Sequence, residues 1–430
     1  MRKLTISILV ALWPAFSMPR AANDPEPFDL ASALALANAS NPAILAYEER
    51  VEALKHVPSQ VEAYPDPQTS VSLTNESLTA FTLGDLQMSN LTLSWQQEVP
   101  YSRKRGLAGD VARSEIDVAS QGCELARLKV RAAVKAAYAE LYRIDRTSSI
   151  VDESRKLLQS FRDAARARQE NGQGILENVI KADTEITQID VELAGLAQQR
   201  RSVVAELNAL FGRAEDAPLG PAVTAPVIRT PDKATIEKEA LDRSPELAMA
   251  RAETKRDENR VDLAKRNLKP DFMWGVGYAY RGSLDPMVMG MFGIRLPVYK
   301  NRKQQEAVAQ SEHELNATRR ELDNRNVSLL AEVRDLLAQA DRATEQMRLI
   351  QDGTLPLARS ALDSAAASYS AGRAEFVTVI EDFRSLLAYQ KDFEMQHAEQ
   401  LKALAALEPF AGTEFVVPGG ASSAPGVSYE

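Results

Sequence analysis

The chain has 430 residues, of which 45% are hydrophobic and only 6% aromatic, a composition typical of long helices that pack along narrow seams. Its 51 basic and 60 acidic residues are mixed along the sequence and give a net charge of −9, which excludes the basic stripe of a nucleic-acid-binding protein. The only cysteine, Cys123, excludes an internal disulfide, a cysteine-based metal cluster and a lipidated cysteine behind a leader. Cys123 lies within a helical pattern, and we expect it to be buried.

The chain begins with the pattern of a secretory signal peptide, assigned to residues 1–22. Arg2 and Lys3 precede an apolar run at 4–12, and a small-residue cleavage site follows near Ala22. No later segment approaches the roughly 18 uninterrupted apolar residues of a transmembrane helix. We therefore expect an exported protein in which any membrane crossing is made by β-strands.

An internal duplication organises the rest of the sequence, because the same landmarks recur in the same order about 200 residues apart. They are Asn41-Pro42 with Ser244-Pro245, Pro65-Asp66 with Pro270-Asp271, Pro100 with Pro297, and Gly172 with Gly372. The duplication predicts a first repeat at 23–211, an equatorial linker at 212–234, a second repeat at 235–408 and a flexible tail at 409–430. Each repeat should contain a helix, two strands, a long helix, a turn and a further helix.

In the first repeat, two strands are predicted at 68–80 and 88–99, where apolar and polar residues alternate weakly. Pro100 stands where the second strand passes into a long helix, a position at which a missing N–H group is tolerated. The helical hairpin at 105–211 has an outgoing arm of some 65 residues, which would be a rod on the order of 100 Å long. Gly172-Gln173-Gly174 ends this arm, because glycine tolerates the positive φ of a tight turn.

The second repeat has a more regular alternation in its two strands, predicted at 271–281 and 287–297. Large apolar residues occupy one face, and mostly small residues or methionines occupy the other, as a strand between lipid and water requires. A strand of a soluble β-sandwich would show the same alternation, so the strands alone leave both interpretations open.

A second helical hairpin is predicted at 302–408, with a turn at Gly372 and a bend where Gly353 and Pro356 interrupt its outgoing arm. Such rods are not stable alone, so neighbouring helices must cover their apolar stripes in a coiled-coil-like wall. Four strands per chain cannot close a barrel, which needs at least about eight. Three copies would supply twelve strands and a ring of helical arms around a lumen, which favours a trimer.

Methionines mark the last strand. Met287, Met289 and Met291 occur at every second position and are expected to share one strand face. Their thioethers could bind Cu(I) or Ag(I). Packing in a barrel is the preferred interpretation, because a conduit gains little by holding its cargo.

Several short motifs resemble those of the TolC family of outer-membrane efflux factors, over a stretch from about Phe28 to Leu407. They are Asn41-Pro42, Ser244-Pro245, Val99-Pro100, Leu296-Pro297, and Tyr369-Ser370-Ala371-Gly372 followed by Val377, Val379 and Ile380. A further set is similar to the branch of this family that serves heavy-metal and cation exporters: Pro65-Asp66-Pro67, Gln97-Glu98-Val99-Pro100 and the basic run Arg103–Arg105.

The resemblance implies a mainly α-helical protein with a membrane β-barrel portion, in which a homotrimer shares a twelve-stranded barrel that continues into a periplasmic tunnel of helical hairpins. It implies a location in the outer membrane of a Gram-negative bacterium, in contact with outer-membrane lipid. The implied partners are a periplasmic adaptor protein and a proton-driven inner-membrane transporter. The chain itself would be the passive export conduit of this tripartite pump, for cargo such as heavy-metal cations.

The resemblance also implies functional residues. The family docks its adaptor at the hairpin turns, which here are Gly172, Gln173, Gly174, Ile175, Gly372, Arg373, Ala374 and Glu375. Its acidic gate follows the second turn, where Glu381 matches one acidic position and Thr378 replaces another, with Glu375 and Asp382 as fallback candidates. Arg373 stands one place before the usual gate arginine, so the gate is expected to have a different arrangement of charged residues. Three symmetric Glu381 carboxylates around a narrow pore would attract cations on physical grounds too, and a solvated acid paired with a neighbouring helix is the alternative.

The strand-to-helix junctions at Pro100 and Pro297 are each followed by basic residues, Arg103–Arg105 and a run at 300–303. In a membrane protein these residues would lie beside lipid headgroups at the inner face of the outer membrane. Ordinary solvated charges are the alternative interpretation.

The competing class is a periplasmic adaptor or coiled-coil scaffold, which is also rich in helical hairpins. An adaptor carries one central hairpin between β-rich halves, whereas here two hairpins alternate with two strand pairs. An enzyme is not indicated, because the sequence contains no Gly-rich phosphate loop and no His-Glu-x-x-His motif. His56, His313 and His397 lie far apart in helical stretches and are expected at the surface. We therefore predict no catalytic residue, no cofactor and no metal site.

Overall fold

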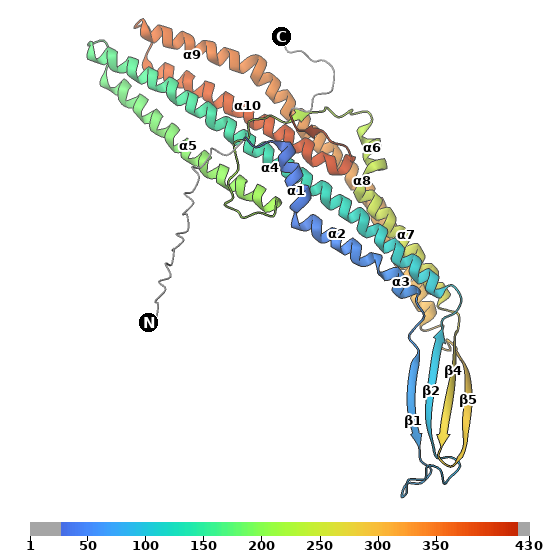
Figure 1. Ribbon diagram of the computed structural model, residues 1–430. Helices are drawn as coiled ribbons and strands as arrows, with labels where there is room; N and C mark the ends of the chain where they lie inside the picture. The colour runs from blue at the N-terminus through green and yellow to red at the C-terminus, as the bar shows by residue number, and fades with distance from the viewer. Residues whose placement is uncertain (1–26, 420–430) are drawn as a thin grey trace, which may run out of the picture.

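The computed structural model describes residues 27–419, so the predicted signal peptide at 1–22 and the end of the predicted tail at 420–430 lie outside the described residues. The described residues form an elongated body of long helices with a β-sheet at one end (Figure 1). The turns of two helical hairpins lie at the opposite end of the body (Figure 1).

The helices are α1 Leu30–Ser40, α2 Pro42–Lys55, α3 Val57–Glu62, α4 Lys104–Glu170, α5 Leu176–Leu210, α6 Ile236–Arg243, α7 Pro245–Arg266, α8 Gln304–Leu349, α9 Leu355–Ser370 and α10 Phe376–Ala411. The strands are β1 Gln68–Thr74, β2 Asn90–Val99, β3 Val227–Ile228, β4 Asp271–Arg281, β5 Leu284–Arg295 and β6 Val416–Val417. The 67-residue α4 reaches from the sheet to the opposite end of the body (Figure 1). The predicted order of helix, strand pair, long helix and helix is confirmed in both halves.

The Asn-Pro and Ser-Pro pairs that mark the repeats are helix N-termini. Asn41 caps α2, where its Oδ1 accepts hydrogen bonds from the N–H groups of Ala43 and Ile44. Ser244 caps α7, where its Oγ accepts a hydrogen bond from the N–H of Leu247. The proline after each cap is the first helical residue, where its missing N–H group leaves no hydrogen bond unmade.

The core lies along α4, which packs against α5, α7 and α10. Near the middle of α4, the ring of Phe28 contacts the fully buried rings of Tyr138 and Phe211. The hydroxyl of Tyr138 donates a hydrogen bond to the carbonyl of Thr224 at 3.0 Å, which ties the linker to the core. Cys123 is buried, as predicted. Every helix between residues 27 and 419 is either too short or too polar to span a lipid bilayer.

The predicted interruption of the second outgoing arm is confirmed. A π-helix at Ile350–Thr354 separates α8 from α9 and contains Gly353. Pro356 lies in the first turn of α9, immediately beyond it. Because proline cannot donate a backbone hydrogen bond, a wider turn just before it lets the chain continue as one arm.

β1, β2, β4 and β5 form an antiparallel sheet in the order β1-β2-β4-β5. The side chains alternate between two faces, and residues directly opposite each other in the register share a face. One face, which we call the apolar face, carries Val71, Leu73, Leu91, Leu93, Trp95, Phe272, Trp274, Val276, Tyr278, Tyr280, Val288, Phe292 and Ile294. The other, which we call the polar face, carries Gln68, Ser70, Ser72, Thr92, Ser94, Gln96, Met273, Gly275, Gly277, Ala279, Met287, Met289 and Met291.

The strands of the first repeat are shorter than predicted, since β1 ends at Thr74 instead of residue 80 and β2 begins at Asn90 instead of residue 88. The cause is Asn75, whose side chain organises the connecting loop. Its Oδ1 accepts hydrogen bonds from the backbone N–H and the hydroxyl of Thr82, and its Nδ2 donates to the carbonyl of Ala80. These local bonds replace the strand ladder.

In the second repeat, β4 has the predicted bounds, but β5 begins three residues earlier than predicted and ends at Arg295 instead of residue 297. The predicted loop around Pro286 is wrong because a two-residue turn is sufficient. Gly282 has a φ of +65° in this turn, a conformation that glycine adopts without strain. Pro286 fits within β5 because the register with β4 shifts between the Ala279–Met287 and Arg281–Leu284 pairs, where the strand ladder is irregular.

The prediction of a flexible tail is wrong for the residues up to 419. α10 continues past the predicted end of the second repeat, and β6 pairs with β3 of the linker. Glu408 holds this segment, because its Oε1 accepts hydrogen bonds from the N–H groups of Phe415 and Val416 at 2.8 Å each. Its Oε2 lies 2.6 Å from the buried ammonium of Lys135. A two-residue strand held by one carboxylate leaves no periodic signal in the sequence.

Candidate functional site

The two hairpin turns, which join α4 to α5 and α9 to α10, have the same backbone geometry. Gly172 and Gly372 both have a φ of +73°. Their N–H groups donate to the carbonyls of Gln169 at 3.0 Å and Tyr369 at 2.9 Å, respectively. A Cβ added at Gly172 would meet no atom within 4 Å. The left-handed backbone, and not a lack of space, therefore explains this glycine.

Arg168, near the end of α4, joins the first turn to the second. Its Nη1 donates to the carbonyls of Tyr369 and Ser370 at 3.0 and 2.9 Å, and its Nη2 donates to the carbonyl of Gln173 at 3.3 Å. The guanidinium also lies over the ring of Tyr369, 5.1 Å from its centroid. Because it binds the last carbonyls of α9, it caps this helix while tying the two turns together. The sequence pattern does not predict this role, since Arg168 resembles the other arginines of α4.

A cleft between the two turns brings together most of the predicted docking residues. Its lining includes Gln173, Gly174, Ile175, Gly372, Ala374 and Glu375, together with Arg168 and Phe376. Gly172 and Arg373 adjoin the cleft in sequence but do not line it. The side chain of Ile175 is 59% exposed, so the tip offers an apolar contact beside charged groups.

The predicted gate residues lie on α10 just beyond the second turn. Thr378 and Glu381 are exposed, one helical turn apart on the same side, and Asp382 is partly exposed beside them. Val379 and Ile380 point into the core. Thr378 and Glu381 therefore form a polar stripe that a lumen or a neighbouring copy could reach.

Two ion pairs beyond the turns join α10 to α5. The guanidinium of Arg384 binds both carboxylate oxygens of the buried Glu185, with Nε to Oε2 at 2.9 Å, and this hydrogen bonding raises the pKa of Arg384. The Nζ of Lys391 lies 2.8 Å from Glu192. The partners in each pair are 199 residues apart, close to the repeat spacing. Opposite charges at nearly equivalent repeat positions are thus the sequence signal from which these pairs could be predicted.

The strand-to-helix junctions lie where the sheet meets the helical body. Pro100 directly follows β2, and Pro297 lies two residues after the end of β5. Lys104, the first residue of α4, is buried, and its Nζ binds Oδ1 of Asp271 and the carbonyl of Lys269 at 2.8 Å each. These contacts join the start of α4, the start of β4 and the segment after α7 into one rigid corner.

The three methionines of β5 share one face, as predicted, and they lie on the polar face. Their partners in the register are Ala279 for Met287, Gly277 for Met289 and Gly275 for Met291. Each methionine thus lies opposite a residue with little or no side chain.

The expectation of a surface position is wrong for His397. Its ring is half-buried and lies edge-on to Tyr142, with centroids 6.1 Å apart, and burial lowers its pKa. Tertiary packing on this side of α10 produces the difference, which helical periodicity alone does not indicate. His56 and His313 are exposed. Within residues 27–419, no group of three or more His, Cys, Asp or Glu side chains could hold a metal ion.

Comparison with known proteins gives a family match for part of the chain and a fold for nearly all of it. Residues 237–413 match the model of the family described as outer membrane efflux protein. A search of curated proteins finds no sequence match. Among solved structures, the outer membrane protein VceC of Vibrio cholerae is 19% identical, with a TM-score of 0.75 over 90% of this chain and 96% of that chain.

Two further structures are similar along nearly their whole length. CusC, whose structures concern folding and transmembrane channel formation, is 14% identical, with a TM-score of 0.77 over 93% of this chain and 95% of that chain. The outer membrane channel MtrE of Neisseria gonorrhoeae, in its open state, is 14% identical, with a TM-score of 0.73 over 93% of this chain and 98% of that chain. At these identities the likeness establishes the fold.

The family match extends from α6 to just beyond α10 and therefore covers the second repeat. The first repeat has the same elements in the same order, and the fold is shared across both. The second repeat accordingly matches the family of outer membrane efflux proteins, and the whole chain has the fold of the solved outer membrane channels.

Proposed function

We propose that the chain is the passive outer-membrane conduit of a tripartite efflux pump and that it works as a homotrimer. A proton-driven inner-membrane transporter and a periplasmic adaptor deliver the cargo, and the chain leads it to the exterior. The resemblance of Pro65-Asp66-Pro67 and Arg103–Arg105 to the cation-exporting branch supports heavy-metal cations as this cargo. The alternative of a periplasmic adaptor or scaffold is less well supported, because residues 237–413 match the family of outer membrane efflux proteins.

The proposal is supported mainly by the sheet, which has one apolar and one polar face and an open edge on each side. The apolar face is strongly exposed, with Val288 at 81%, Phe292 at 73% and Val71 at 68%. Within the described part of the chain, β1 and β5 each have a strand partner on one side only. An apolar face of this kind aggregates in water, and in lipid every strand edge must be paired. Copies of the sheet that join edge to edge in a membrane satisfy both requirements.

The number of copies follows from the size of the bore. Two sheets would give eight strands, and a barrel of about eight strands is only wide enough to be filled by its own side chains. Three sheets give twelve strands and leave an open lumen. The polar face, with its serines, threonines, glutamines and glycines, then lines the water-filled bore, and the apolar face meets lipid.

The opposite end of the body supports roles in docking and gating. The cleft between the turns offers the exposed Ile175 and the carboxylate of Glu375 to an incoming helical hairpin of the adaptor. The stripe of Thr378 and Glu381 would face the pore, where three Glu381 carboxylates concentrate negative potential and attract cations. The links of Arg168 hold both turns of one protomer together, so they would move as a unit.

Recording ion currents across planar lipid bilayers tests the proposal. Purified full-length protein added to one side should produce discrete conductance steps. As a control on location, the protein should remain with the outer membrane after salt and carbonate washing. A protein that washes off and gives no current would be a scaffold, and the proposal would fail.

The cargo is tested separately from the channel. Removing the chain from its host should increase sensitivity to heavy-metal salts, and wild-type protein supplied in trans should restore growth. Unchanged metal sensitivity together with increased sensitivity to organic drugs would contradict the cation cargo while leaving the conduit intact.

A further inference from the structure

A basic pocket lies at the corner where the sheet meets the helical body. It has a volume of about 280 Å³ and is lined by Arg103, Leu107, Asp262, Lys265, Arg266 and Lys269. Lys265 lies 3.0 Å from Glu312, so its charge is already matched. Arg103, Arg266 and Lys269 form no ion pair with any carboxylate of residues 27–419. The pocket therefore presents three cations against the single carboxylate of Asp262.

Hydrogen bonds to Ser102 and Lys104, which do not line the pocket, hold two of its lining residues in place. The Nε of Arg266 donates to the carbonyl of Ser102 at 2.8 Å, and the buried Nζ of Lys104 binds the carbonyl of Lys269. Arg103 has a φ of +69° and is the only non-glycine residue with a positive φ among the described residues. These features fix the positions of the backbones that carry the three cations.

The pocket is continuous with the apolar face of the sheet. The guanidinium of Arg266 lies 4.8 Å from the ring centroid of Tyr101. Tyr101 stacks on Phe272 with centroids 6.3 Å apart, and Phe272 stacks on Phe292 at the same separation. The side chains of Arg266, Tyr101 and Phe272 therefore form a continuous row, from a cation through a tyrosine to the apolar face. An anionic phospholipid has the matching order of phosphate, glycerol region and acyl chain.

We propose that Arg103, Arg266 and Lys269 bind the phosphate of an anionic phospholipid in the inner leaflet of the outer membrane, with an acyl chain lying along Phe272 and Phe292. The inference rests on the proposed function, which puts the apolar face in lipid. Guanidinium and ammonium groups are the usual protein ligands of phosphate, and basic pockets beside membrane segments favour anionic headgroups. The bound lipid would anchor the corner at which the barrel passes into the helices.

Counting bound lipids by native mass spectrometry tests the site. Purified full-length protein in a neutral detergent is titrated with phosphatidylglycerol or with phosphatidylcholine of the same chain length. Phosphatidylglycerol should bind more tightly, and Arg103→Gln and Lys269→Gln should each weaken it roughly fivefold. Asp262→Asn should strengthen it by a similar factor, a gain that misfolding cannot produce. Inorganic phosphate should compete poorly, since it lacks the acyl chain.

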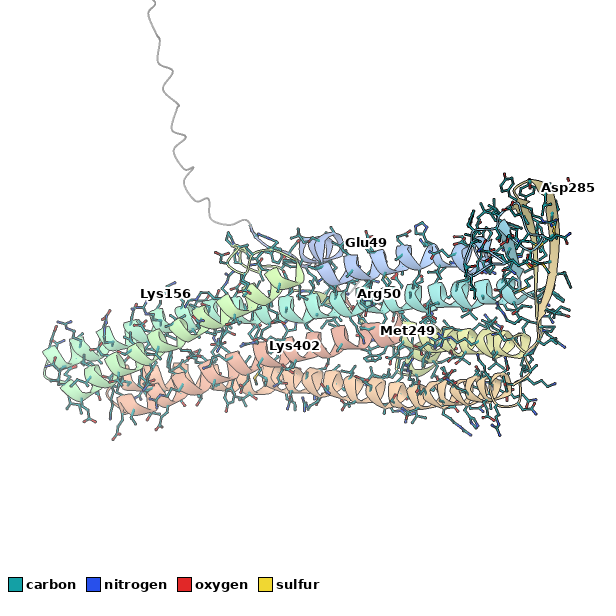
Figure 2. All side chains as sticks on the ribbon, turned by 90° about the horizontal axis from the view of Figure 1, so that it is seen from below. Glu49, Arg50, Lys156, Met249, Asp285 and Lys402 are labelled. Atoms are coloured by element: carbon teal, nitrogen blue, oxygen red, sulfur yellow. The ribbon has the colours of Figure 1, made fainter. Side chains whose placement is uncertain are left out.

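The matched control is Lys156→Gln, on the helical body far from the sheet end marked by Asp285 (Figure 2). It should leave the lipid preference unchanged. Equal binding of the two lipids to wild type, or no effect of any pocket variant, would overturn the site. If such a protein still conducts ions, the proposed function stands and only this inference fails. A protein that does not conduct overturns both.

Discussion

The buried ion pair between Lys135 and Glu408 should be the main anchor of the segment after α10. The side chains are 0% and 4% exposed and lie 2.6 Å apart. Burial raises the pKa of Glu408, and the ammonium of Lys135 with two backbone N–H groups opposes that effect. The pair is ionised in the folded protein, because removing either charge would leave the other buried without a counter-ion.

The perturbation is to remove one charge at a time with little change in shape, by Glu408→Gln and by Lys135→Met. Glu408→Gln leaves the ammonium of Lys135 buried without a counter-ion, and Lys135→Met does the same to the carboxylate of Glu408. Each substitution should lower the free energy of unfolding by about 3–5 kcal/mol. The double variant removes both charges and should lose less stability than the sum of the two single variants, since the partners are in direct contact.

Hydrogen exchange at the amides of Phe415 and Val416 reports this loss directly, because both N–H groups donate to Glu408. A loss of about 3 kcal/mol corresponds to roughly a hundredfold faster exchange if the segment opens locally. The matched control is the exposed pair of Lys55 and Glu52 on α2, at 2.6 Å. Lys55→Met and Glu52→Gln should change nothing measurable.

The reasoning is refuted if both single variants exchange at the wild-type rate, or if their effects on stability simply add in the double variant. Either result would mean that the short strand pair of β3 and β6, and not the buried charges, holds the segment.

Three further predictions concern the tip, the gate and a buried acid. Gly172→Val or Gly372→Val forces a β-branched residue to a φ of +73°, a strain of about 1–3 kcal/mol. The protein should still assemble, but it should no longer support efflux in a resistance assay. Normal resistance would contradict the docking role of the turns. Glu381→Gln should alter single-channel conductance or its block by polyvalent cations, and unchanged values would remove Glu381 from the gate. Burial raises the pKa of Glu394 above 4.5, despite Arg146 at 3.3 Å. The stability that the protonated form of Glu394 contributes is present below pH 4.5 and is lost as pH rises through the raised pKa. Glu394→Gln should therefore make the free energy of unfolding, measured in urea, depend less on pH in that window. An unchanged pH dependence would exclude Glu394 as its cause.

Much of the fold could be predicted because its signals are local. The caps at Asn41 and Ser244, and the left-handed turns at Gly172 and Gly372, are properties of a few neighbouring residues. They recur in both halves, so each half supports the interpretation of the other. The long helices follow from the periodicity between these landmarks.

The features that were not predictable depend on residues distant in the sequence. Arg168 binds carbonyls of the other hairpin, and Glu408 holds amides of a strand too short to have a period. Helical periodicity likewise could not indicate that packing half-buries His397 on α10. β1 ends earlier than predicted because the side chain of Asn75 forms local hydrogen bonds that compete with the strand ladder. The functional residues at the tip were placed by resemblance, and the cleft that joins most of them is a property of the folded chain.

The central claim is that several copies of this chain share one pore wall, and the mass of the intact particle tests it most directly. Native mass spectrometry of protein extracted from the outer membrane in mild detergent should give three chains per particle. A particle that contains a single chain, stable in detergent with its sheet edges open, would contradict the account.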